Sequence, residues 1–508
     1  MTPRRVPHLP LVCPLVLWLC GGQELVLRTN VHVVEVGIVA TDGKGAPASD
    51  LRAGDFHVWD NGREQTIGSF EKVISVAAAS ADLPPNTYSN RTRKAGHPQV
   101  LSMILLDAVS TKLPTQLRAR HAVESAIEQL QPEQRVALYA FGAGYRLRTL
   151  HDFSSDKESL LAKLRAYPGQ VPDFDSFLAE VGFVDMEHPM DAGKMPSLQM
   201  LRDKERILAS LKALETIADH VKGVPGRKNL LVVSSGFPLA ADGKGGEDPR
   251  TPGLERFQSQ LQHAMAALNN ASVSVYPIDA RGLTISPMAK YNIGTMRDMA
   301  DSTGGKAFYN RNDLATGVRV ALDDAREVYV LTYSPQPMVA DGAYHTIRVT
   351  SSQQGVQLRY RLGYYAPEKV DEAGSAEPLD RLKELVSDPL DASEIGIQAT
   401  LELAAEDIAL AIHVDPADVN LVPSADRWTG ALRLEAMQLG AAGEQLGGVN
   451  QSAEINLLQE TYERDLVQGM PFEMKFPREP SAIAVRIGVV DERGAHRGSV
   501  SVPLPPLP

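Results

Sequence analysis

The sequence contains very little cysteine. Its only two cysteines, Cys13 and Cys20, lie close to the beginning of the 508-residue chain. Disulfide bonds, cysteine-based zinc sites and thiol nucleophiles are therefore excluded from everything after Cys20. Any binding or chemistry in the rest of the chain must rest on oxygen and nitrogen groups.

Long apolar runs are lacking after the first two dozen residues. The run Leu9–Leu19 follows two arginines and precedes two glycines, which is the three-part pattern of a secretory signal peptide. We therefore predict a signal peptide over residues 1–22 and an exported protein, periplasmic or extracellular, with no transmembrane segment in the mature chain. A lipid anchor on Cys20 is the alternative, which the bulky Leu19 before it disfavours.

Positively charged residues are fewer than negatively charged ones. The chain has 51 lysines and arginines against 63 aspartates and glutamates, a net charge of −12. Because nucleic-acid binding depends on basic groups that contact phosphates, we expect no nucleic-acid partner. The acidic balance remains compatible with a cation or a protein as partner. A chain of this length is too long to fold around one hydrophobic core, so we expect about three domains.

The most informative segment that is present is Val100–Thr111, VLSMILLDAVST. An apolar run without polar alternation is typical of a strand buried on both faces of a parallel sheet. In such sheets ligands bind just beyond the carboxyl ends of the strands. Asp107 ends this run, so it marks the place where a functional site is expected.

Strands alternate with helical segments through the middle of the chain, and strand patterns dominate on both sides. We therefore predict a multidomain protein whose central α/β domain is a doubly wound parallel sheet, flanked by a small N-terminal β module and a C-terminal β-sandwich. Asn61-Gly62 predicts a hairpin in the β module. The predicted segments are the signal peptide (1–22), the N-terminal β-rich module (25–75), a linker (76–98), the α/β domain (99–327), a β extension (328–367), a linker with a short helix (368–390) and the β-sandwich (391–508).

Several segments resemble known proteins. The strand that ends in Asp107, together with Arg135–Leu164 and Met296–Asn310, resembles the von Willebrand factor type A (VWA) domain. The flanking segments Thr41–Phe70 and Arg361–Pro367 resemble the acidobacterial-type VWFA-related family of exported proteins. The resemblance implies a Rossmann-like VWA fold and metal-dependent adhesion, with a divalent cation, usually Mg²⁺, at the top of the sheet. It implies no established activity.

The metal-ion-dependent adhesion site implied by this resemblance is degenerate. The family pattern is D-x-S-x-S after the first strand, a threonine from a second loop, and an aspartate after the fourth strand. Here Asp107 and Thr111 match, but Val109 replaces the first serine and Ser235 replaces the aspartate. No matching threonine loop appears near Tyr167–Phe174.

Two interpretations of this edge are open. In the first, Asp279 after the fifth strand compensates for the lost ligands, and the site holds Mg²⁺ or Ca²⁺. In the second, Asp279 pairs with Arg281 or caps the next turn, and Asp107 caps the following helix. The candidate metal ligands of the first interpretation are Asp107, Ser110, Thr111, Ser235 and Asp279.

No catalytic constellation and no cofactor-binding motif are found. Ser234-Ser235-Gly236 ends a strand, but the sequence offers no histidine partner for a hydrolase. We therefore predict a non-enzymatic protein-binding or scaffolding protein at the cell envelope, with a protein as its partner. The alternatives are an envelope hydrolase or carbohydrate-acting enzyme with an accessory VWA domain, and a structural module with a vestigial site. The predicted contact loops are 107–111, 167–197, 234–244 and 279–283.

Overall fold

The computed structural model describes residues 33–506, except residues 49, 76–82, 92–99, 170–197, 237–257, 284–286, 338–340, 367–377, 404–406, 425, 442 and 495. The predicted signal peptide, with Cys13 and Cys20, lies outside the described residues. So do most of the predicted contact loop 167–197, after Gly169, and the part of loop 234–244 that follows Gly236. Within the described part of the chain, no helix combines the length and the apolar character needed to cross a bilayer.

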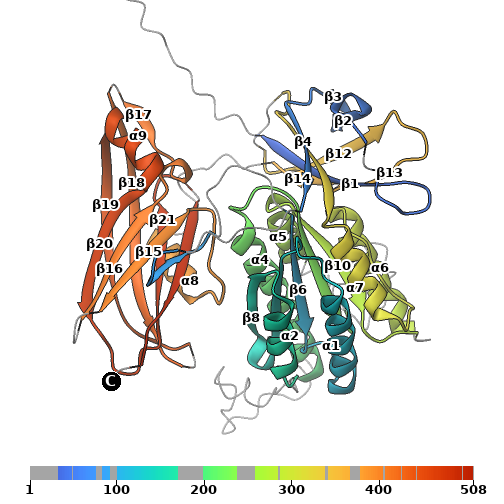
Figure 1. Cartoon of the computed structure of the whole chain (residues 1–508), viewed down its shortest axis with the longest axis horizontal. Helices are drawn as coiled ribbons and strands as arrows, with labels where there is room; N and C mark the ends of the chain where they lie inside the picture. Colours follow the sequence, from blue (N-terminus) through green and yellow to red (C-terminus); the bar gives the residue numbers. More distant parts are fainter. Residues whose placement is uncertain are drawn as a thin grey trace, which may run out of the picture. The chain divides into compact units, whose positions relative to one another are not determined.

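The central α/β domain is built on a five-stranded sheet in the order β10-β9-β6-β7-β8 (Figure 1). Four of these strands run parallel. Each of these four is buried along its whole length, as the apolar runs predict. The strands are β6 (Leu101–Asp107), β7 (Val136–Gly142), β8 (Arg146–Ser154), β9 (Lys228–Ser234) and β10 (Val273–Asp279).

The sheet is mixed rather than wholly parallel, which corrects the prediction. Strand β8 pairs antiparallel with β7. Only the 3₁₀ turn Ala143–Tyr145 separates the two strands, and Gly144 in that turn has a φ of 66°. A parallel neighbour needs a crossover of a dozen or more residues, so this short connection permits only a hairpin. The antiparallel strand sits at the edge of the sheet.

Helices cover both faces of the sheet. Alternate residues of β6 point to opposite sides: Met103 and Leu105 pack with α4, α5 and α6, whereas Ile104 and Leu106 pack with α1, α2 and α7. This double layer buries every apolar side chain of the parallel strands. The helices are α1 (Leu113–Glu128), α2 (Lys157–Ala166), α4 (Leu198–Val221), α5 (Gln258–Asn270), α6 (Pro287–Thr303) and α7 (Leu314–Asp323).

Strands from before and after the α/β domain combine into one β-sandwich. Its two sheets have the orders β13-β1-β11-β4 and β14-β12-β2-β3, so the predicted segments 25–75 and 328–367 share both sheets. Asn61 and Gly62 have φ angles of 46° and 78° and connect β2 to β3. The strands are β1 (Val34–Thr41), β2 (Phe56–Asp60), β3 (Arg63–Gln65), β4 (Ser69–Ile74), β11 (Glu327–Tyr333), β12 (Tyr344–Ser351), β13 (Gln357–Arg359) and β14 (Gly363–Tyr365).

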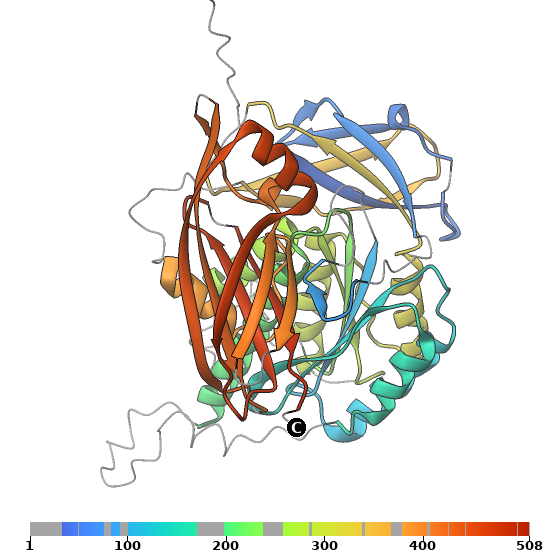
Figure 2. The same ribbon diagram turned by 60° about the vertical axis from the view of Figure 1, so that its left-hand side comes forward.

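The last part of the chain forms a second two-sheet sandwich (Figure 2). One sheet has the order β20-β16-β15-β5, and β5 comes from the segment predicted as a linker before the α/β domain. The other sheet joins β17, β18, β21 and β22, with β19 paired to β18. The elements are β5 (Thr87–Ser89), α8 (Pro378–Ser387), β15 (Ile397–Leu403), β16 (Asp407–Val414), β17 (Val422–Ser424), β18 (Arg427–Leu439), β19 (Gln445–Leu458), α9 (Gln459–Gln468), β20 (Met470–Pro477), β21 (Ala484–Asp491) and β22 (Arg497–Pro503).

Candidate functional site

The carboxyl ends of β6, β9 and β10 bring the candidate residues to one edge of the sheet. Asp279 is in register with Ser234 on the neighbouring strand. Leu106 is in register with Val233, so Asp107 lies beside Ser234 as well. The first, fourth and fifth strands of the domain, β6, β9 and β10, are neighbours in the sheet. This edge is where an open α/β sheet binds ligands.

Asp107 is buried, with 8% of its surface exposed, and its carboxylate is held by neutral donors. The Ser234 hydroxyl donates to Oδ2 at 2.6 Å, and the backbone N–H of Ser110 donates to Oδ1 at 3.0 Å. Burial raises the pKa of Asp107, and the hydrogen bonds from Ser234 and Ser110, together with the charge of Arg206, offset part of that rise. Among the described residues, no ion pair joins Asp107 to a lysine or arginine.

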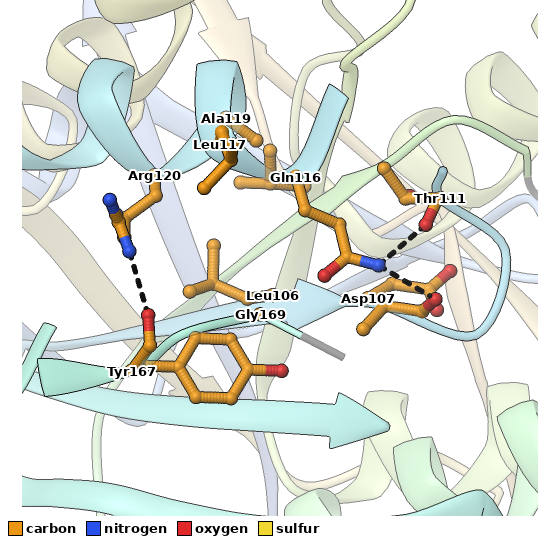
Figure 3. A pocket seen from close by; sticks show the side chains of 11 residues that line it. Leu106, Asp107, Thr111, Gln116, Leu117, Ala119, Arg120, Tyr167 and Gly169 are labelled. Carbon is orange, nitrogen blue, oxygen red and sulfur yellow. Dashed lines mark hydrogen bonds between the residues drawn. The ribbon is translucent and has the colours of Figure 1, made fainter. Parts of the chain in front are cut away.

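The loop after β6 is braced by the first turn of α1. Gln116 Nε2 donates to the carbonyl oxygens of Ala108 at 3.2 Å and Thr111 at 2.6 Å (Figure 3). The Thr111 hydroxyl oxygen accepts from the backbone N–H of Ser235 at 2.9 Å. Thr111 and Ser235 therefore fasten the loop to the end of β9. Asp107 caps this loop through Ser110, whereas Lys112 occupies the N-cap position of α1.

Asp279 is neutralised within its own loop. Its Oδ1 accepts from Arg281 Nε at 2.8 Å, and its Oδ2 accepts from Arg281 Nη2 at 2.7 Å. Only 1% of Asp279 is exposed. This bidentate pair is the second of the two interpretations that the sequence left open. Because the guanidinium already occupies both oxygens, Asp279 does not supply a negative charge to a neighbouring ligand.

The residues at this edge fit a divalent cation poorly. A hard cation prefers six or more oxygen ligands and the negative charge of carboxylates. Of the two carboxylates in the predicted set, Asp279 forms an ion pair and Asp107 forms none among the described residues. Val109 packs against the hydrophobic cluster beneath α4. Nowhere in the described ranges do three or more His, Cys, Asp or Glu residues form a group suited to a metal ion. Metal binding by the five predicted residues stays a prediction.

A pocket opens beside Asp107, between β6, α1 and the segment after α2 (Figure 3). Tyr167 supplies one wall: its ring is 8% exposed, and its hydroxyl has no hydrogen-bond partner among the described residues. Burial raises the pKa of Tyr167; Arg148 opposes that rise, and the charge of Asp107 adds to it. The lining residues are Leu106, Asp107, Ala108, Thr111, Gln116, Leu117, Ala119, Arg120, Tyr167, Gly169 and Val233.

No sequence pattern assigns a role to Tyr167. The VWA pattern has a threonine ligand in this region, and the segment Tyr167–Phe174 contains no threonine. The structure places a tyrosine hydroxyl there instead, positioned because Arg120 donates to the Tyr167 carbonyl oxygen at 2.8 Å. The only feature of the sequence that could have pointed to Tyr167 is its position, directly after a predicted helix and before a long Pro/Gly-rich segment.

Solved structures that resemble this chain include VWA-type domains, at low sequence identity and low TM-score. No family profile matches the sequence, and no curated protein matches it significantly. The hypothetical protein BatB from Bacteroides thetaiotaomicron is 13% identical over 45% of this chain and 98% of its own, with a TM-score of 0.25. The vWF domain of the type V pili tip protein Mfa5 from Porphyromonas gingivalis is 11% identical over 45% and 94%, with a TM-score of 0.25.

A third structural neighbour is proximal thread matrix protein 1 from the mussel byssus. It was solved with a zinc-occupied MIDAS motif, and it is 11% identical with a TM-score of 0.24. The alignment covers 47% of each chain, so this chain spans about half the length of the mussel protein. The VWA-like fold therefore rests on the strand order and helix layers described above. Membership of the acidobacterial-type family stays a prediction.

Proposed function

We propose that this chain is an exported, non-enzymatic adhesion or scaffolding protein that binds a protein partner through the edge of the sheet at Asp107. One observation carries the proposal. At the carboxyl edge of the sheet, Asp107 is the predicted carboxylate without an ion pair among the described residues, the charge of Arg206 offsets only part of its burial, and it lines a pocket. An unbalanced buried charge is costly in an isolated protein, so a partner that balances it gains affinity.

The chemistry of the neighbouring groups favours binding over catalysis. The Ser234 hydroxyl donates to the Asp107 carboxylate rather than to an imidazole, so it lacks the general base that activates a serine nucleophile. The backbone N–H of Ser235 donates to Thr111 and is not free to stabilise an oxyanion. These contacts hold the edge in one rigid arrangement, which suits a recognition surface.

Affinity capture tests this function. The full mature chain is immobilised and exposed to envelope proteins, with Asp107→Asn and Asp156→Asn as a matched pair of variants. Asp156 caps α2 through Glu158, and asparagine preserves such caps. We expect one or more proteins retained by the wild type and by Asp156→Asn, with retention reduced about tenfold or more by Asp107→Asn. Equal retention by all three proteins, or none by any, would overturn the proposal.

Metal removal gives a second prediction. Because Arg281 occupies Asp279 and Ser235 stands where the VWA pattern has an aspartate, the fold should not depend on a bound cation. A ligand that binds only the folded chain raises its melting temperature. We therefore expect excess EDTA, Mg²⁺ or Ca²⁺ to move the melting temperature by less than about 1 °C. A larger rise with Mg²⁺ or Ca²⁺ that Asp107→Asn abolishes would restore the metal-dependent interpretation.

Hydrolase activity is the competing function. Its test is a screen of the same mature chain on ester, peptide and glycoside substrates beside a Ser234→Ala variant. Turnover that disappears in Ser234→Ala would replace the binding proposal by the enzymatic one.

A further inference from the structure

We propose that the pocket beside Asp107 receives the ammonium group of a lysine side chain from the protein partner. This inference rests on the proposed function and names the chemistry of its contact. In a metal-dependent adhesion site, a cation lies between the carboxylates of the two proteins. Here the cation would belong to the partner and contact Asp107 directly.

Charge is the first argument. The two oxygens of Asp107 accept hydrogen bonds from a hydroxyl and an amide, and neither donor carries a charge. The carboxylate is nevertheless nearly closed off from water, and the charge of Arg206 offsets only part of the cost of burying its ionised form. An ammonium group would restore that balance and would form a charge-assisted hydrogen bond. Arg120 also lines the pocket, but Glu124 balances its charge at 3.3 Å, so Asp107 would repel a carboxylate or phosphate ligand.

The walls of the pocket supply the second argument. Leu106, Leu117 and Val233 contribute apolar surface, and Leu117 is partly exposed to solvent. A lysine side chain carries its charge at the end of a four-carbon apolar stem, so the stem packs on such walls while the ammonium reaches the carboxylate. The Tyr167 hydroxyl, without a partner among the described residues, offers the ammonium a second acceptor.

The hydrogen bonds on Asp107 distinguish lysine from arginine. A guanidinium binds a carboxylate best through two parallel bonds, one to each oxygen. Ser110 already occupies one direction at Oδ1, and Ser234 occupies one at Oδ2. An ammonium is a compact donor and needs only one free lone pair. We therefore expect a primary ammonium to bind better than a guanidinium on the same stem.

The probe for this site is n-butylammonium, which has the stem and head group of a lysine side chain. Binding to the full mature chain is measured by saturation-transfer NMR and calorimetry, with n-butanol, n-butylguanidinium and tetramethylammonium as comparisons. We expect saturable binding of n-butylammonium and at least about tenfold weaker binding of each comparison compound, because charged hydrogen bonds are the strong ones. Asp107→Asn should weaken n-butylammonium about tenfold or more, and Tyr167→Phe about threefold.

Two further variants complete the experiment. Leu117→Trp enlarges a side chain that lines the pocket, so it should also weaken binding. Asp156→Asn should leave binding unchanged. Melting curves verify that each variant is folded. Equal binding of n-butanol and n-butylammonium, or binding unaffected by both Asp107→Asn and Leu117→Trp, would overturn the inference. If Asp107-dependent partner capture occurs without n-butylammonium binding, the lysine inference fails and the proposed function stands. If n-butylammonium binds but no partner is captured, the proposed function fails.

Discussion

Replacing Arg227 with leucine is expected to lower the free energy of unfolding by about 4 kcal/mol or more, a large part of the stability of a typical domain. Arg227 is 2% exposed at the start of the α/β domain's fourth strand. Its guanidinium donates to Asn229 Oδ1 and the Gly37 carbonyl, each at 3.1 Å, and to the Tyr276 hydroxyl at 3.1 Å and the Gly304 carbonyl at 2.6 Å. Leucine would leave these four groups without their donor. Each buried polar group that loses its partner costs about 1–3 kcal/mol.

Because of the position of Arg227, we expect the loss of stability to extend beyond strand β9. Gly37 lies on β1 of the first β-sandwich, and its backbone passes so close that a Cβ there would lie 3.0 Å from Arg227 Cβ. Arg227 therefore connects β1 to the α/β domain. We expect hydrogen exchange to accelerate in β1 as well as in β9.

Urea denaturation followed by circular dichroism measures the effect, and Arg227→Lys is the matched control. Lysine keeps the charge but cannot reproduce the planar fork, so it should fall between the wild type and Arg227→Leu. If Arg227→Leu lowers the free energy of unfolding by less than about 1 kcal/mol, water or neighbouring groups must replace the lost donors.

The parts of the fold that the sequence predicts are those determined by local patterns. The uninterrupted apolar run that ends at Asp107 predicts strand β6, and Asn61-Gly62 predicts a hairpin because both residues adopt positive φ. The direction of β8 was missed because it depends on the length of one turn. The pairing of β5 with β15 joins residues about three hundred positions apart, and no local pattern contains that information.

For the candidate site, too, the sequence predicts the features that depend on local patterns and misses those that depend on the three-dimensional fold. The edge itself followed from Asp107 at the end of a buried strand. The sequence does not separate the two interpretations of Asp279, because the same position after a buried strand suits a metal ligand and a partner of Arg281. The hydrogen bonds between the two side chains favour the arginine. Tyr167 had no family pattern to match, so only the three-dimensional pocket brings it to Asp107.

Lys228 should make stability depend on pH in the alkaline range. It is 1% exposed, and its Nζ donates to the Val224 carbonyl at 2.6 Å. Burial lowers its pKa from 10.5 to about 8; Glu35 opposes this shift, and Arg361 reinforces it. Between these two pKa values the unfolded chain holds a proton that the folded chain has released. The contribution of Lys228 to stability therefore rises with pH from about 8 to 10.5.

Lys228→Met isolates this contribution. Below pH 8 the wild type carries a buried charge at a cost of about 3 kcal/mol, from a shift of about 2.5 pKa units at 1.36 kcal/mol each. Methionine removes that charge, which stabilises the fold. It also loses the hydrogen bond to the Val224 carbonyl, which reduces this gain in stability by about 1 kcal/mol. We expect Lys228→Met to be more stable than the wild type by about 2 kcal/mol at pH 7. That advantage should disappear or reverse near pH 10.5.

The measurement is urea denaturation of both proteins at a series of pH values, taken as the difference between them. Groups that titrate equally in the two proteins, including the buried tyrosines, cancel in that difference. Lys163→Met is the control, because Lys163 is exposed on α2 and should give a flat difference. A flat difference for Lys228→Met as well would mean that the Nζ charge is balanced within the fold. Glu35 would then be the source of that balance, and a Glu35→Gln variant should recover the pH dependence.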